Sequence, residues 1–89
     1  MAIFMIERRY ADELRVDAAT AEQINLINAD EDVRWLYSFL AADLRKTYCL
    51  YEATSIEAIQ RAAVRAGLPA DVIVEVSGKV RPDGSLVPI

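Results

Sequence analysis

The sequence contains no histidine, which removes several kinds of site from consideration. A Ser-His-Asp triad, a Cys-His pair and a metal site built on imidazole ligands all require that residue. The chain also has only three glycines and no glycine-rich loop that could cradle phosphate groups. We therefore expect no cofactor, and a metal site would have to use Glu, Asp and Cys ligands.

A single cysteine, Cys49, excludes an internal disulfide bond, and a reducing cytoplasm is the simplest expectation for the location of the protein. Without a histidine to activate the thiol, we expect Cys49 to be a packed core residue.

No apolar run approaches the roughly 20 residues of a membrane span, and the apolar segment 1–6 reads as a first strand. A net charge of −4 disfavours a phosphate-binding surface. We expect neither nucleic acid nor a membrane as a partner.

Hydrophobic periodicity and capping residues divide the 89 residues into alternating strands and helices. Asp17 is a plausible N-cap for the first helix. Thr54 fits the N-cap of the second, with Glu57 three residues later as a capping box requires and Gly67 at the position that ends a helix. The predicted strands cover residues 2–10, 33–40, 46–53 and 71–77, and the predicted helices cover 18–30 and 55–66.

This order, βαββαβ, predicts an α+β fold of the ferredoxin-like sandwich type. We expect a four-stranded antiparallel sheet with two helices on one face. We also take the strands over 2–10 and 46–53 to be neighbours at the centre and to run parallel. The domain is predicted to end at residue 78, and residues 79–89 form a C-terminal tail that adds an edge strand or is flexible.

The hairpin over 33–53 contains the only tryptophan and three of the four tyrosines. Strict alternation places one set of its residues under the helices and the other on the open face of the sheet. The open set is too apolar to leave in water, so we expect a homodimer in which two sheets pack face to face, closing a dimeric α/β barrel. The helix-side set is Leu36, Leu40, Cys49 and Tyr51, and the open set is Trp35, Tyr37, Phe39, Tyr48 and Glu52.

Candidate ligand-binding residues follow from these phases. Glu7 and Glu52 each come near the end of a strand, and parallel neighbouring strands would bring both carboxylates to one end of the sheet. Tyr37, Tyr48 and Trp35 would complete the pocket. Paired carboxylates can share a proton or hold a metal. The alternative is an ordinary ion pair of Glu7 with Arg9, Arg34 or Lys46, with the aromatic residues forming the core of an interface.

Several segments resemble a known family of small bacterial ferredoxin-like proteins of unknown function, some of which are described as nickel-binding. The matching segments are Glu7-Arg8, Val33-Arg34-Trp35-Leu36 with Ser38, Lys46-Thr47-Tyr48-Cys49-Leu50-Tyr51-Glu52-Ala53 and Ala66-Gly67-Leu68-Pro69-Ala70-Asp71. The resemblance spans residues 2–76 and implies a ferredoxin-like dimer and, for some members, a nickel site. Members of the family often carry histidine where Tyr37 stands and near Ala62, and this chain has neither.

Three hypotheses about function remain open at this stage. The first is a non-enzymatic binding protein that holds a metal ion or a small ligand in the dimer cavity. The second is a small cofactor-independent enzyme of the proton-transfer or oxygenase type, in which Glu52 or Glu7 moves a proton and Tyr37 or Tyr48 steadies an oxyanion. The third is a structural or assembly role. We favour binding, because the sequence supplies no strong nucleophile or base.

Overall fold

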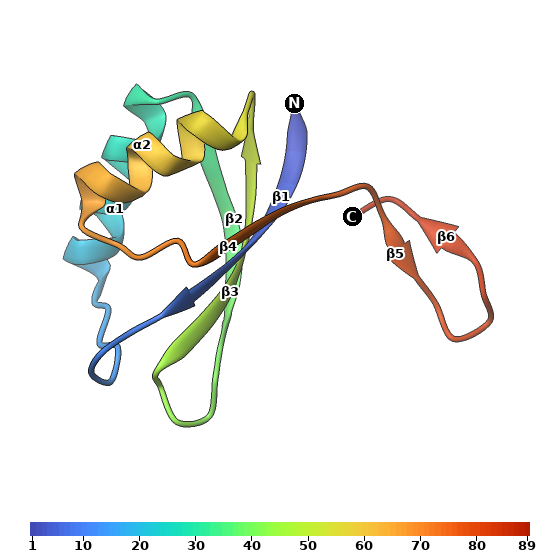
Figure 1. The fold of residues 1–89 in the computed structure, drawn as a ribbon, viewed down its shortest axis with the longest axis horizontal. Coiled ribbons are helices and arrows are strands. Elements are labelled where there is room, and N and C mark those ends of the chain that lie inside the picture. Colours follow the sequence, from blue (N-terminus) through green and yellow to red (C-terminus); the bar gives the residue numbers. More distant parts are fainter.

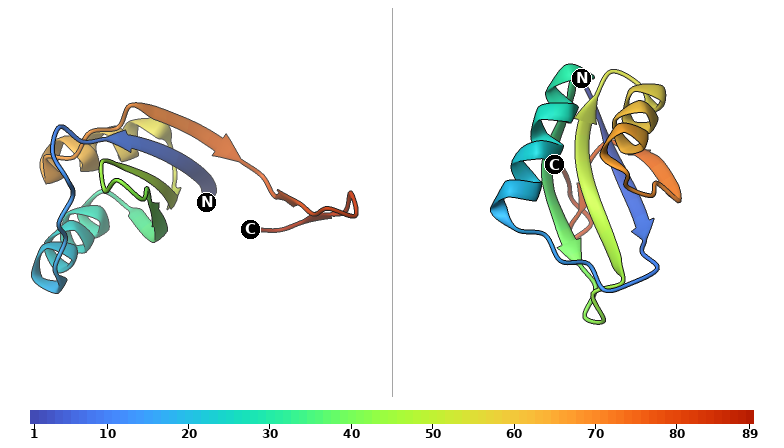
Figure 2. Two further views of the ribbon diagram at one scale, coloured as in Figure 1. Left: turned by 90° about the horizontal axis from the view of Figure 1, so that it is seen from below. Right: turned by 90° about the vertical axis from the view of Figure 1, so that its left-hand side faces the viewer.

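A computed structural model describes all residues, 1–89, and shows a four-stranded sheet with two helices against one face (Figure 1). The end-on view in Figure 2 places both helices on the same side of the sheet. The ferredoxin-like α+β prediction is therefore confirmed. The elements in chain order are β1 (Ala2–Arg9), α1 (Ala18–Asp30), β2 (Val33–Leu40), β3 (Lys46–Ala53), α2 (Ile56–Ala66), β4 (Val72–Val76), β5 (Lys79–Val80) and β6 (Leu86–Val87).

The strand order is β2-β3-β1-β4, and every neighbouring pair in this sheet is antiparallel. The prediction that β1 and β3 run parallel is wrong. The helical crossover through α1 makes β1 and β2 parallel, but they are not neighbours. The hairpin places β3 in the gap between them, so β3 runs against both.

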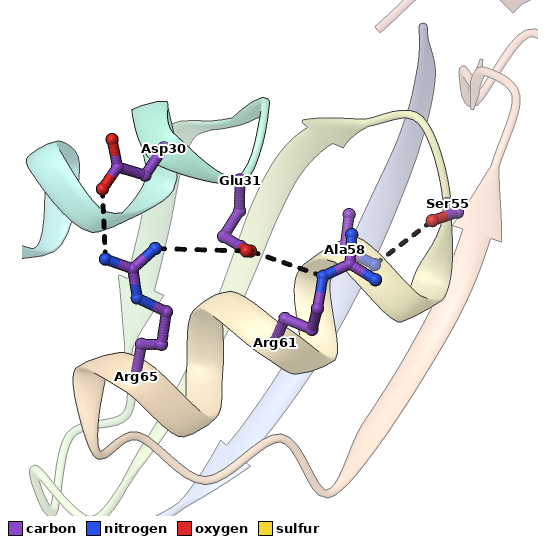
Figure 3. A network of polar contacts seen from close by, with 6 residues as sticks. All are labelled: Asp30, Glu31, Ser55, Ala58, Arg61 and Arg65. Carbon is purple, nitrogen blue, oxygen red and sulfur yellow. Dashed lines mark hydrogen bonds and ion pairs between the residues drawn. The ribbon is translucent and has the colours of Figure 1, made fainter.

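Both helices begin and end at residues with a local reason to do so. Asp17 caps α1, its Oδ1 accepting a hydrogen bond from the Thr20 backbone N–H at 2.8 Å. The N-cap of α2 is Ser55, not the predicted Thr54, and Ser55 Oγ accepts from the Ala58 N–H at 3.2 Å (Figure 3). Gly67 ends α2 in the left-handed region, at φ 69°, as predicted.

The hydrophobic core lies between the helices and the sheet, where Ile6 and Ile59 are almost completely buried. At the edge of this layer, ion pairs join the end of α1 to α2 (Figure 3). Glu31 lies 3.4 Å from Arg61 and 4.0 Å from Arg65, and Asp30 lies 3.1 Å from Arg65. These two exposed arginines therefore tie the two helices together.

An irregularity in β2 changes which face Trp35 occupies. The register with β3 shifts between Trp35 and Tyr37, so that Leu36 is an extra residue. Trp35 thus pairs with Tyr51 on the helix side, and their rings stack at 6.4 Å between centroids. The prediction that Trp35 shares a face with Tyr37 is wrong, because strict alternation does not continue through a bulge.

The C-terminal tail forms a separate two-stranded sheet, in which β5 pairs antiparallel with β6. Its turn is closed by Asp83, whose Oδ1 accepts hydrogen bonds from the backbone and hydroxyl of Ser85. This hairpin projects from the side of the sheet opposite the helices (Figures 1 and 2). No helix of the chain is long and apolar enough to cross a membrane.

Candidate functional site

The open face of the four-stranded sheet consists of three rows of side chains that cross all four strands. Apolar residues dominate these rows, and several are widely exposed: Phe39 is 60% exposed, Val74 51% and Tyr37 47%. The rows are, in the order β4, β1, β3 and β2: first Val72, Glu7, Tyr48 and Phe39; second Val74, Met5, Leu50 and Tyr37; third Val76, Ile3, Glu52 and Arg34.

Glu7 lies in the first row, beside Tyr48, as the sequence predicted for this face. Its carboxylate is held by two cations, with Arg9 Nη2 at 2.7 Å and Lys46 Nζ at 3.8 Å. The Lys46 ammonium also lies 5.8 Å from the centre of the Tyr48 ring, within the range of a cation–π contact. The structure thus matches the alternative in which Glu7 forms an ion pair.

Glu52 lies in the third row and pairs with Arg34 Nη2 at 3.2 Å. In the antiparallel register Glu52 stands opposite Ile3, four residues along β1 from Glu7. At about 3.4 Å per residue, the two acids are about 14 Å apart. The predicted pairing of Glu7 with Glu52 within one chain is therefore wrong, and its cause is the direction of β3.

Tyr37 and Tyr48 both face the open side, in adjacent rows. The rings of Tyr37 and Phe39 form a T-shaped pair with 5.6 Å between centroids. A groove of about 240 Å³ lies next to these rings, between the sheet and the C-terminal tail. Leu50 and Ile89 both line this groove, so the last residue of the chain borders the same space as the central row of the open face.

The potential metal ligands of this chain do not form a cluster. No group of three or more His, Cys, Asp or Glu side chains is placed to hold a metal ion. Cys49 is buried on the helix side as predicted, with Sγ 3.4 Å from Thr47 Oγ1. One chain therefore does not offer the imidazole and thiolate donors that nickel prefers.

A second cavity, which the sequence interpretation missed, lies on the helix side of the sheet. It contains the buried cation Arg8 and two tyrosines, Tyr10 and Tyr51. Burial raises the pKa of both phenols above 10.0, and this effect is opposed at Tyr10 by the hydrogen bond with Thr47 and at Tyr51 by the charge of Arg8. The signal in the sequence was an arginine in phase with the apolar residues Phe4 and Ile6 of the first strand.

Comparison with known proteins identifies relatives of this fold and sequence. No curated protein matches the chain. The crystal structure of SCO4226 from Streptomyces coelicolor A3(2) is 36% identical and superimposes with a TM-score of 0.71, covering 84% of this chain and 95% of that one. The family described as "Nickel responsive protein SCO4226-like" matches residues 4–76. The chain therefore belongs to the SCO4226-like family, as the resemblance of its hairpin and second helix predicted.

Proposed function

We propose that the chain is a non-enzymatic binding protein of the cytoplasm that forms a homodimer through the open face of its sheet. A small ligand or a divalent metal ion is then held in the space between the two sheets. Glu7, Tyr37, Tyr48 and Glu52 are the residues that face this space. Trp35, although predicted as a fifth, points to the other side of the sheet.

The exposed apolar face carries this proposal. Monomeric proteins rarely expose a continuous apolar patch of more than a few hundred square ångströms. Here Phe39, Tyr37 and Val74 are each about half exposed or more, and Tyr48 and Val72 are partly exposed on the same face. The helices cover only the opposite face, and the C-terminal tail borders one groove of the open face, so a second copy of the sheet is a natural cover for the rest. The resulting assembly is a dimeric α/β barrel.

The metal version of the proposal rests on the description of the family as nickel responsive. Glu7 and Glu52 are too far apart to share an ion within one chain, and arginine and lysine already neutralise them. An ion between the sheets would therefore need carboxylates from both copies, related by the two-fold axis. Oxygen ligands of this kind suit hard cations better than nickel.

The proton-transfer alternative gains no support from the geometry. A general base needs a carboxylate that is free to accept a proton from a substrate. Glu7 is instead paired with Arg9, and Glu52 with Arg34, so neither carboxylate is free for that role. Binding therefore remains the function that the open face supports best.

Light scattering coupled to gel filtration tests the dimer. At micromolar concentration we expect a mass of twice the 9.9 kDa of the chain. A single-chain mass would remove the basis for a site between two sheets.

Calorimetric titration with nickel, zinc, cobalt and manganese then tests the metal. Absence of heat with all four would remove the metal version, whereas heat that is lost in Glu7→Gln but kept in the exposed helix variant Glu57→Gln would support it.

A further inference from the structure

Arg8 is a buried cation without an acidic partner. It is 2% exposed and lies on the helix side of β1, next to Thr47 of β3. Its guanidinium donates a hydrogen bond to the carbonyl oxygen of Pro69 and lies 5.4 Å from the centre of the Tyr51 ring. None of the ion pairs of the structure includes it. A guanidinium stays charged in a protein, and burying a charge without a counter-ion is costly.

A cavity of about 150 Å³ opens beside this guanidinium, between the sheet, α1 and the segment that precedes α1. Nine of its twelve lining residues are hydrophobic, and none is an aspartate or a glutamate. Leu14, Val16 and Ile24 form the wall opposite the sheet. An apolar protein cavity of about 150 Å³ is large enough to hold one benzene molecule. The space therefore matches a single ring, and Arg8 supplies positive charge at its edge.

Hydroxyl groups add neutral donors to the same cavity. Ser38 Oγ accepts a hydrogen bond from Trp35 Nε1 at 2.9 Å, which leaves the Ser38 hydroxyl hydrogen free to donate. The hydroxyls of Tyr10 and Thr47 lie 2.8 Å apart, so one donates to the other and the second hydrogen stays free. A guanidinium fork with nearby O–H donors is suited to a carboxylate.

We propose that this cavity is a binding site for a monocarboxylate whose apolar body has the size of one aromatic ring. Arg8 pairs with the carboxylate, and the apolar wall covers the ring. The site lies on the opposite face of the sheet from the proposed dimer space, so it does not depend on dimerisation or on metal binding. No residue of the open face contributes to it.

Benzoate is the probe, and its neutral analogue benzamide has nearly the same shape. Trp35, the only tryptophan, lines the cavity, so its fluorescence reports binding directly. We expect saturable binding of benzoate to the full chain with a dissociation constant of about 1 mM or lower. Benzamide should bind roughly 10-fold to 100-fold more weakly, because it cannot form a charge-assisted bond with Arg8.

Variants then locate the site. Arg8→Met should weaken benzoate binding by a similar factor, roughly 10-fold to 100-fold, whereas Arg8→Lys should retain part of the affinity. Arg9→Met is the matched control, since its side chain is exposed on the open face and pairs with Glu7. Leu14→Phe, which narrows the cavity from the loop before α1, should also weaken binding measured by calorimetry.

The proposal would be overturned by no saturable binding up to about 20 mM benzoate, by equal affinity for benzamide, or by unchanged affinity in folded Arg8→Met. If circular dichroism shows that Arg8→Met does not fold, the comparison of benzoate with benzamide and the Leu14→Phe variant decide. Binding that survives in folded Leu14→Phe at the wild-type affinity would place the benzoate elsewhere and refute the site.

Discussion

Phe39 is the most exposed large apolar residue of the open sheet face, at 60%, and its replacement by lysine tests what that face does. A phenylalanine side chain offers about 200 Å² of surface, so about 120 Å² remains to be covered. At about 25 cal/mol per Å², full coverage contributes about 3 kcal/mol per subunit, and a two-fold axis doubles this to about 6 kcal/mol. If only a third of that is realised, Phe39→Lys weakens dimerisation about 30-fold.

Sedimentation equilibrium of wild type and Phe39→Lys over a range of concentrations measures this change directly. Leu26→Lys is the matched control, because Leu26 is 65% exposed but lies on α1, away from the open face. It should leave the dimer constant unchanged. Equal dimer constants for wild type, Phe39→Lys and Leu26→Lys would refute a role for the open face, as would an interface weakened only by Leu26→Lys.

Three further predictions concern stability. Ser55→Ala removes the N-cap of α2 and should lower the free energy of unfolding by about 1 kcal/mol in urea titrations, whereas Thr54→Ala should change it little; equal effects would contradict the assigned cap. Because burial raises the pKa of Tyr10 and Tyr51, the unfolded chain loses these protons first. The stabilisation that comes from keeping the two phenols neutral is complete below pH 10.0 and should be lost as the pH rises through their native pKa values. Urea titrations of wild type and Tyr51→Phe at alkaline pH measure this loss. Glu31→Gln breaks the ion pairs with both arginines of α2 and should cost about 0.5–1 kcal/mol in dilute buffer and less in about 1 M salt; a cost that does not depend on salt would exclude an electrostatic origin.

Periodicity and capping residues were sufficient to predict most of the fold. The strands over 33–40 and 46–53 and the helix over 18–30 have the predicted bounds, because alternating apolar residues, Asp17 and the acidic segment after the helix mark them locally. Gly67 marked the end of α2 for the same reason, since a left-handed residue there favours glycine. Such features depend only on neighbours in the chain.

The candidate site was harder to predict, because it depends on features that local patterns do not encode. The direction of β3 relative to β1 separates Glu7 from Glu52, and it follows from the topology of the whole sheet. The bulge at Leu36 moves Trp35 to the other face, although nothing in the residues of β2 announces an insertion. Arg8 is in phase with Phe4 and Ile6, but only the tertiary fold brings the loop before α1 and Pro69 over it.

The central position of β1 has a consequence for how this protein folds as it is synthesised. Both partners of β1 are made later than β1 itself: β3 ends at residue 53 and β4 at residue 76. At about 5–20 residues per second, the 67 residues from Tyr10 to Val76 take roughly 3 to 13 s to translate. Until β3 has been made, Ile3, Phe4 and Ile6 have no strand to pair with, and until β4 follows, β1 keeps one unpaired edge in the nascent chain. The sheet can close around it only when the last of its four strands emerges from the ribosome.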